Sequence, residues 1–161
     1  MIVKNTFQPG DFEAQHANPV WRSKSDFIIA ADISGPDRMR RWEQLWARRH
    51  SEREFEICCI PFFVYDLNLG SVVETDDEFI VARTVRDSGR FVFRIWFERD
   101  TSDTVRIDLV QRIEQMGYLH ERFSERLMSI DAASLAPAQR LSSLLQAEEQ
   151  MGRLKFETGR R

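Results

Sequence analysis

The sequence predicts a mixed α+β protein in which a small antiparallel β-barrel-like lobe shares one strand with a ferredoxin-like βαββαβ lobe. Up to residue 98, short apolar runs alternate with turn residues, as in an antiparallel sheet. After residue 98, two amphipathic helical patterns alternate with short strand-like runs. The expected organisation is an irregular N-terminal extension at 1–24, the β lobe at 25–89, the ferredoxin-like lobe at 90–158 and a tail at 159–161.

The N-terminal extension shows neither helical nor strand periodicity, because Gly and Pro residues interrupt it. It nevertheless carries three aromatic residues, Phe7, Phe12 and Trp21. Terminal segments are usually loose unless side chains tie them down. We therefore expect an arm that packs on its own protein.

The β lobe begins with FIIAADI, an apolar run that turn residues close at 34–36. Residues 41–50 fit either a helical stripe or an alternating strand. We predict a strand, because a polar break at 51–53 precedes EFEICCI, in which Phe55, Ile57 and Cys59 alternate with polar or small neighbours as in a hairpin partner.

Pro61 ends this ladder, since proline supplies no amide hydrogen. The chain then turns a corner through FFVYDLNLG and forms a strand at SVVET. FIVARTV and RFVFRIWF follow as a hairpin around Asp87, Ser88 and Gly89. Five or six short antiparallel strands of this kind indicate a small barrel or a strongly coiled sheet.

The ferredoxin-like lobe is predicted from the order of its elements. Strand 90–98 precedes a helix with Thr101 or Ser102 as its cap; two short strands, a second helix after Pro137 and the strand LKFE follow. Strand 90–98 is expected to serve both lobes. Its two faces are Phe91, Phe93, Ile95 and Phe97 on the helix side, and Val92 and Trp96 on the side of the β lobe.

Composition limits the possible partners and compartment. A formal charge of -3 gives no general attraction to nucleic acid or to anionic lipid. No apolar run is long enough for a membrane span, and the N-terminus lacks the apolar stretch of a secretory signal. We expect a cytoplasmic protein that does not associate with membranes.

No catalytic or metal-binding motif is found. Cys58 and Cys59 are neighbours whose side chains point to opposite faces of a strand, so they are predicted to be two small buried apolar residues. His16, His50 and His120 lie in three separate elements, and we expect each on the surface or at a cap. The sequence therefore predicts no catalytic residue, no metal site and no cofactor.

Several short motifs lie between residues 45 and 97: LWA at 45–47, IPFF at 60–63, LGSVV at 69–73 and SG at 88–89. Together they resemble an uncharacterised bacterial family, the domain of unknown function 4265. At the position of Ser71, Asp is the commoner residue in that family. The resemblance extends over residues 26–158. It implies no catalytic residue and no partner.

The remaining prediction is a non-catalytic binding protein, either an accessory protein or an immunity-type protein. It would capture a peptide or protein on a sheet edge, at 26–33, 118–123 or 153–157, or in an aromatic groove between the lobes. A homo- or heterodimer is also compatible with the sequence. The candidate partner-binding residues are Trp42, Trp46, Arg48, Arg49, Phe62, Phe63 and Tyr65.

Two alternatives stay open. One is an RNA-binding module, since arginines surround Trp42 and Trp46; nucleic acid is disfavoured because glutamates dilute that cluster. The other is an enzyme whose active site is assembled in the cleft between the lobes.

Overall fold

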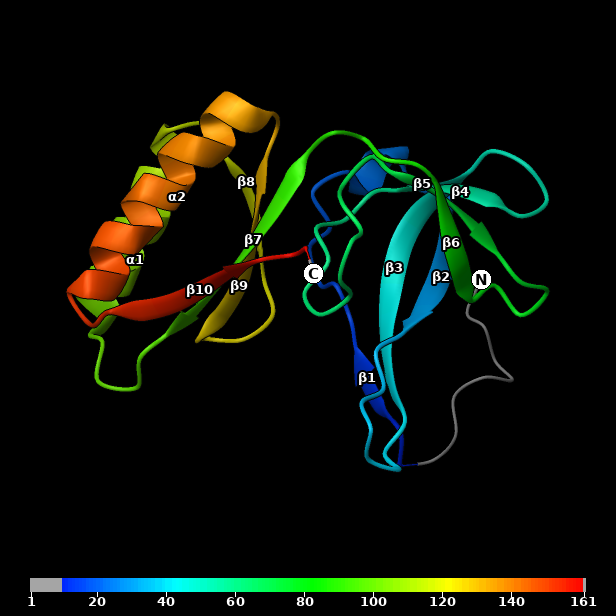
Figure 1. Cartoon of the computed structure of the whole chain (residues 1–161), viewed down its shortest axis with the longest axis horizontal. Helices are drawn as coiled ribbons and strands as arrows, with labels where there is room; N and C mark the ends of the chain where they lie inside the picture. The colour runs from blue at the N-terminus through cyan, green and yellow to red at the C-terminus, as the bar shows by residue number, and fades with distance from the viewer. Residues whose placement is uncertain (1–9, 161) are drawn as a thin grey trace.

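The computed structural model describes residues 10–160 and divides them between two sheets (Figure 1). The predicted α+β class is confirmed, with two α-helices. The elements in chain order are β1 (Phe12–Ala14), the 3-10 turn η1 (Arg22–Lys24), β2 (Phe27–Asp32), β3 (Arg41–Arg49), β4 (Glu54–Ile57), β5 (Val72–Thr75), β6 (Val81–Arg86), β7 (Phe91–Phe97), α1 (Asp103–Gln115), β8 (Leu119–Arg122), β9 (Leu127–Ala132), α2 (Leu135–Gln150) and β10 (Leu154–Thr158).

The first sheet contains six strands and is organised around β3. Strand β2 pairs with one edge of β3, while β1 and β4 pair with it along the rest of the path β1-β3-β4-β5-β6. The sheet curls until Ala30 of β2 forms a single bridge to Ile80, just before β6. The barrel-like prediction is therefore wrong on closure: within residues 10–160 one bridge, and no ladder, joins the two ends of the sheet.

The second sheet has four antiparallel strands in the order β10-β7-β9-β8. Its elements follow one another as β-α-β-β-α-β, the predicted succession. Ser102 caps α1, since its side chain accepts a hydrogen bond from the Val105 amide. Figure 1 shows α1 and α2 together on one face of this sheet, and the other face turned toward the six-stranded sheet.

Strand β7 does not belong to both sheets. It pairs with β9 on one edge and β10 on the other, so no edge remains for the six-stranded sheet, and the prediction of a shared strand is wrong. The predicted hairpin of β6 with β7 is wrong for the same reason, since β6 pairs with β5. The two faces of β7 do serve different layers. Ile95 belongs to the core under the helices, whereas Val92 packs with Ile60 and Leu69 between the two sheets.

The N-terminal segment is more regular than predicted. Phe12–Ala14 forms a strand parallel to the start of β3, although three residues are too few to show a periodic pattern. Trp21 packs against the cluster between the sheets, as expected of an arm held by its own protein. The predicted contact of Phe7 lies outside the described residues.

No helix within residues 10–160 is both long and apolar enough to cross a membrane.

Candidate functional site

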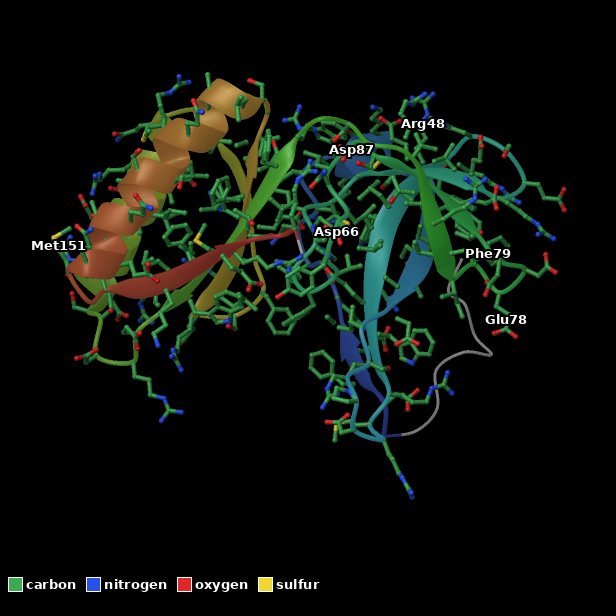
Figure 2. All side chains as sticks on the ribbon, in the orientation of Figure 1. Arg48, Asp66, Glu78, Phe79, Asp87 and Met151 are labelled. Atoms are coloured by element: carbon green, nitrogen blue, oxygen red, sulfur yellow. The ribbon has the colours of Figure 1, made fainter. Side chains whose placement is uncertain are left out.

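The proline corner, residues 58–70, lies between the two sheets and provides most of the site. Figure 2 shows Asp66 at this central position. Asp66 has a left-handed backbone (φ 58°), and its amide donates a hydrogen bond of 2.7 Å to the Gly159 carbonyl, just after β10. The corner is thus fastened at one end to the last strand of the second sheet.

A single buried carboxylate shapes the corner. Glu43 of β3 is fully buried, and it accepts hydrogen bonds from three successive amides: Oε1 from Phe62 at 2.6 Å, and Oε2 from Phe63 and Val64 at 2.9 Å each. Hydrogen bonds to a buried anion are among the stronger ones in proteins, and successive amides form a natural anion-binding concavity. Glu43 therefore determines where the corner's aromatic side chains point.

His16 joins this carboxylate to the second sheet. Its Nε2 is 3.0 Å from Glu43 Oε1, and its Nδ1 is 2.7 Å from Glu121 Oε1 on β8. The other oxygen of Glu121 accepts a 2.5 Å hydrogen bond from the Ile60 amide. The imidazole ring also stacks on Phe62 with a centroid separation of 4.2 Å. The His16 cluster, defined as His16, Glu43, Cys59 and Glu121, therefore connects the N-terminal segment, both sheets and the corner.

The contacts of His16 and the direction of its pKa shift both favour the doubly protonated ring. Both ring nitrogens face carboxylate oxygens, and neutral imidazole has only one N–H to donate. Burial alone lowers the pKa of His16, but its contacts with Cys59, Glu121 and Glu43 outweigh this effect and raise the pKa well above its usual value. Burial alone raises the pKa of Glu43. The hydrogen bond and charge of His16, together with the corner amides, outweigh this effect and hold the pKa of Glu43 below its usual value.

Cys59 beside His16 has the composition of a nucleophile and its base, but not the access. Cys59 is completely buried and His16 is 4% exposed. Burial raises the pKa of the Cys59 thiol despite the nearby imidazolium, so the thiol stays neutral. A substrate cannot reach this pair in the folded protein. The cluster is built to hold the two sheets together.

His16 is the site residue that sequence reasoning missed. It was expected at the surface, but it is buried, because its partners lie 27 and 105 residues away along the chain. His50 is exposed, as predicted, whereas His120 is half-buried, and each contacts a glutamate. Within residues 10–160, no group of three or more His, Cys, Asp or Glu residues is arranged to hold a metal ion.

Above the cluster, the surface is hollowed into a groove between the sheets. Two adjoining cavities form it, with volumes of about 720 Å³ and about 500 Å³, and both are lined by Phe63 of the corner and Trp96 of β7. We call this the inter-sheet groove. Its other aromatic side chains are Phe12, Phe62, Tyr65 and Phe123.

These aromatic side chains support one another at the groove. Phe63 makes edge contacts with Phe12 and Phe123, at centroid separations of 6.0 and 5.0 Å. Phe12 is 37% exposed, and Phe63 and Phe123 are partly exposed. The groove therefore presents a connected aromatic wall to solvent, and Phe62, which stacks on His16, links that wall to the buried cluster.

A buried arginine closes the floor of the groove. Arg94 of β7 is fully buried; its guanidinium lies 4.7 Å from the centre of the Tyr65 ring, and it donates to the Val64 carbonyl and, at 3.4 Å, to Glu157. Tyr65 donates its hydroxyl to the same Glu157 carboxylate at 2.8 Å. The corner, β7 and β10 are thereby joined at the groove.

The structure brings three of the seven predicted partner-binding residues together. Phe62, Phe63 and Tyr65 all line the groove. The other four, Trp42, Trp46, Arg48 and Arg49, line neither of its two cavities. Figure 2 shows Arg48 at the rim of the six-stranded sheet, apart from Asp66.

Three of these four residues of β3 are engaged elsewhere, whereas Arg48 is exposed. Trp42 is only 2% exposed, so it is not available as a surface anchor. Trp46 is partly buried beneath the Arg22 guanidinium, 5.2 Å from its ring centre. Arg49 donates to the backbone carbonyls at 51 and 52 and covers three phenylalanine rings of the sheet core.

Comparison with known families assigns the protein to one of them. A family model, the domain of unknown function DUF4265, matches residues 43–156. The chain belongs to the DUF4265 family. The match contains Glu43, Cys59, Glu121 and the whole proline corner, while His16 precedes it.

A solved structure extends the comparison of the DUF4265 fold. The chain is similar to a hypothetical protein from Neisseria gonorrhoeae known from a crystal structure, with a TM-score of 0.68 and 18% identity. The similarity covers 82% of this chain and 92% of that one. No curated protein matches the sequence. These comparisons support the fold and carry no activity.

Proposed function

We propose that this protein is a non-catalytic binding module that holds an extended peptide, or an extended segment of a protein, in the inter-sheet groove. In this proposal a curled β lobe and a ferredoxin-like lobe form the two walls, and the protein acts in the cytoplasm as an accessory or immunity-type protein. The observation that carries it is the connected aromatic wall around Phe63 and Trp96, whose side chains are partly exposed in the groove.

A sheet edge lies beside this wall. Strand β10 is the last strand of its sheet and pairs only with β7, so its outer edge is open along Leu154–Thr158 within the described part of the chain. Glu157 of this strand lines the larger cavity. An extended peptide added to such an edge gains main-chain hydrogen bonds, while alternate side chains enter the adjoining groove. The predicted edge at 153–157 is therefore the one we favour.

The groove is also pre-organised, which favours binding over a merely adaptable surface. Its corner is held by three amide hydrogen bonds to Glu43 and by the Asp66 contact with Gly159. A rigid groove loses little conformational entropy when a ligand enters it.

Two observations weigh against the alternatives. RNA-recognition sheets stack bases on the face opposite their helices. Here that face contributes Glu121 and Ser129 to contacts with the corner, which covers it. For an enzyme, the one thiol–imidazole pair, Cys59 with His16, is sealed from solvent.

Selection from a phage-displayed library of random peptides tests the proposal. Selected peptides are then titrated by calorimetry against the wild-type protein and the variant Phe63→Ala. Because a few buried aromatic contacts dominate most interfaces, we expect Phe63→Ala to weaken binding about ten-fold or more.

Ile107→Ala is the matched control, since Ile107 is 54% exposed on α1 and lies outside the groove. Its affinity for the selected peptides is expected to equal that of the wild type. Circular dichroism establishes that both variants fold. Failure to select any peptide, or equal affinities for all three proteins, contradicts the proposal.

A further inference from the structure

Trp96 differs from the other tryptophans in what covers its ring. The sequence contains four tryptophans. Three of them lie under cations of the protein itself: Lys24 and Arg90 at Trp21, Arg40 at Trp42, and Arg22 at Trp46, all within 4.6–5.5 Å of the ring centre.

Within residues 10–160, the Trp96 ring has neither a cation nor another aromatic ring against it, and it is partly exposed. It also lines both cavities of the groove. The neighbouring aromatic face on Tyr65 is already occupied by Arg94. Trp96 therefore offers the groove an indole ring with no cation of residues 10–160 against it.

The charges around this ring are unevenly satisfied. Each arginine of the groove is engaged by the protein: Arg41 with both oxygens of Asp37, Arg94 with Glu157 and the Val64 carbonyl, and Arg126 with the Phe97 carbonyl. Two exposed carboxylates of the groove form no ion pair within the described part of the chain. They are Asp32 in the larger cavity, which accepts a hydrogen bond of 2.8 Å from the Ser34 amide, and Glu125 in the smaller.

We propose that the inter-sheet groove recognises a basic peptide, with a lysine or arginine side chain lying on Trp96 and further basic side chains meeting Asp32 and Glu125. An indole face attracts a cation most strongly of the aromatic side chains, and nearby carboxylates add a charge-assisted contact. A peptide segment rather than a free amine is the occupant, because the aromatic wall and the open edge of β10 extend well beyond the ring. This inference rests on the proposed peptide-binding function and adds the charge of the ligand.

Arg94 and Arg126 line the two cavities together with Trp96, and a further cation, Lys155, lies opposite it. Lys155 of β10 is directly opposite Trp96 across the antiparallel pair, and it is exposed. Its charge repels a basic ligand without covering the ring. Removal of this charge is therefore expected to tighten the binding of a basic peptide, which is the reverse of the effect expected at Asp32 or Glu125.

Three synthetic peptides with the same apolar residues test the proposal: acetyl-Lys-Leu-Lys-Leu-Lys-amide, the counterpart with glutamine at each lysine, and the counterpart with glutamate. They are titrated by calorimetry at about 20 mM and about 300 mM salt, because screening weakens exposed charge pairs. We expect the basic peptide to bind about ten-fold more tightly than the glutamine peptide at low salt, with the glutamate peptide weakest.

Variants assign this preference to the groove. The double variant Asp32→Asn with Glu125→Gln is expected to bind the basic peptide about five-fold more weakly, and Lys155→Ala about two-fold more tightly. Glu149→Gln is the charge-matched control, since Glu149 is exposed on α2, on the other side of the four-stranded sheet. It is expected to leave the affinity unchanged.

Trp96→Leu keeps apolar bulk but removes the aromatic face. It is expected to abolish the advantage of the basic peptide over the glutamine peptide, measured as the ratio of their two affinities for the variant. If the glutamine peptide binds in a manner sensitive to Phe63→Ala but the basic peptide binds no better, charge recognition is refuted and the proposed function stands. If no peptide binds to the folded protein, both are refuted. An equal loss in Glu149→Gln and in the double variant also overturns the inference, since it shows general attraction between opposite charges.

Discussion

Replacement of Glu43 by glutamine removes the charge that holds the proline corner in place. The amide group keeps one oxygen acceptor but presents a donor where Oε2 now accepts from Phe63 and Val64. Two partly buried amides thus lose their acceptor. His16 also loses one of its two carboxylate partners.

The magnitude follows from these contacts. A hydrogen bond to a charged group contributes about 1.5–3 kcal/mol, and removal of one member of a buried ion pair costs about 3–5 kcal/mol. The two effects overlap, so we expect Glu43→Gln to lower the free energy of unfolding by about 3–5 kcal/mol. With a urea m-value of about 2 kcal/mol/M, the midpoint falls by about 1.5–2.5 M.

Urea denaturation followed by circular dichroism measures this change. Glu74→Gln is the matched control, because Glu74 forms a surface pair with Arg83, and such pairs contribute about 0–1 kcal/mol. A loss below about 1 kcal/mol for Glu43→Gln, similar to that for Glu74→Gln, would refute the role of the carboxylate in holding the corner.

Three further predictions concern the same region. The folded-state pKa of His16 is raised, so its contribution to the free energy of unfolding is complete below pH 6.5 and is lost as pH rises. The folded-state pKa of Glu43 is lowered, so its contribution is lost only as pH falls below about 4.5. The free energy of unfolding should therefore decline by up to about 1.4 kcal/mol per pH unit between pH 6.5 and 8.5, and a flat or rising stability over that range in urea titrations would contradict the imidazolium. Burial raises the pKa of Cys58 to about 12 and also raises that of Cys59, so iodoacetamide should leave both thiols unmodified in the folded protein and alkylate both in urea, as read by mass spectrometry. Gly70→Ala should lower the free energy of unfolding by about 1 kcal/mol more than Gly89→Ala. Both glycines have positive φ, but a Cβ at Gly70 would lie 3.3 Å from the Trp21 ring, whereas one at Gly89 would meet open space. Equal losses in thermal denaturation would disprove this crowding at Gly70.

The regular elements were predictable because their signals are local. The Ser102 cap and the strand at β3 each depend on residues close together in sequence, and both predictions agree with the structure. The predicted hairpin around Asp87, Ser88 and Gly89 is wrong, because β6 pairs with β5 while β7 pairs with β9 and β10, so this turn connects the two sheets. Closure of the barrel and sharing of β7 were wrong, because they depend on which edges meet in space. Local sequence patterns do not specify which strand edges pair with one another.

The site was harder to predict than the fold, since its centre is assembled from distant residues. One signal was nevertheless present. Glu43 lies on the same face of β3 as Leu45 and Ala47, and a glutamate on an apolar strand face requires a buried partner. Nothing local indicates that the partner is His16, and the aromatic residues of β3, which do not line the groove, gave the stronger signal.

The His16 cluster also explains why the corner uses a charged group where an apolar one would pack more simply. Apolar residues of similar volume often replace a buried ion pair without loss of stability, so stability alone does not account for the cluster. An apolar side chain at Glu43 would leave the amides of Phe62, Phe63 and Val64 without acceptors, and the corner would have to adopt another conformation. Directional bonds to one carboxylate permit a single arrangement of these residues. That arrangement places Phe63 against Phe123 and beside Trp96, so the shape of the inter-sheet groove depends on a charge that no ligand touches.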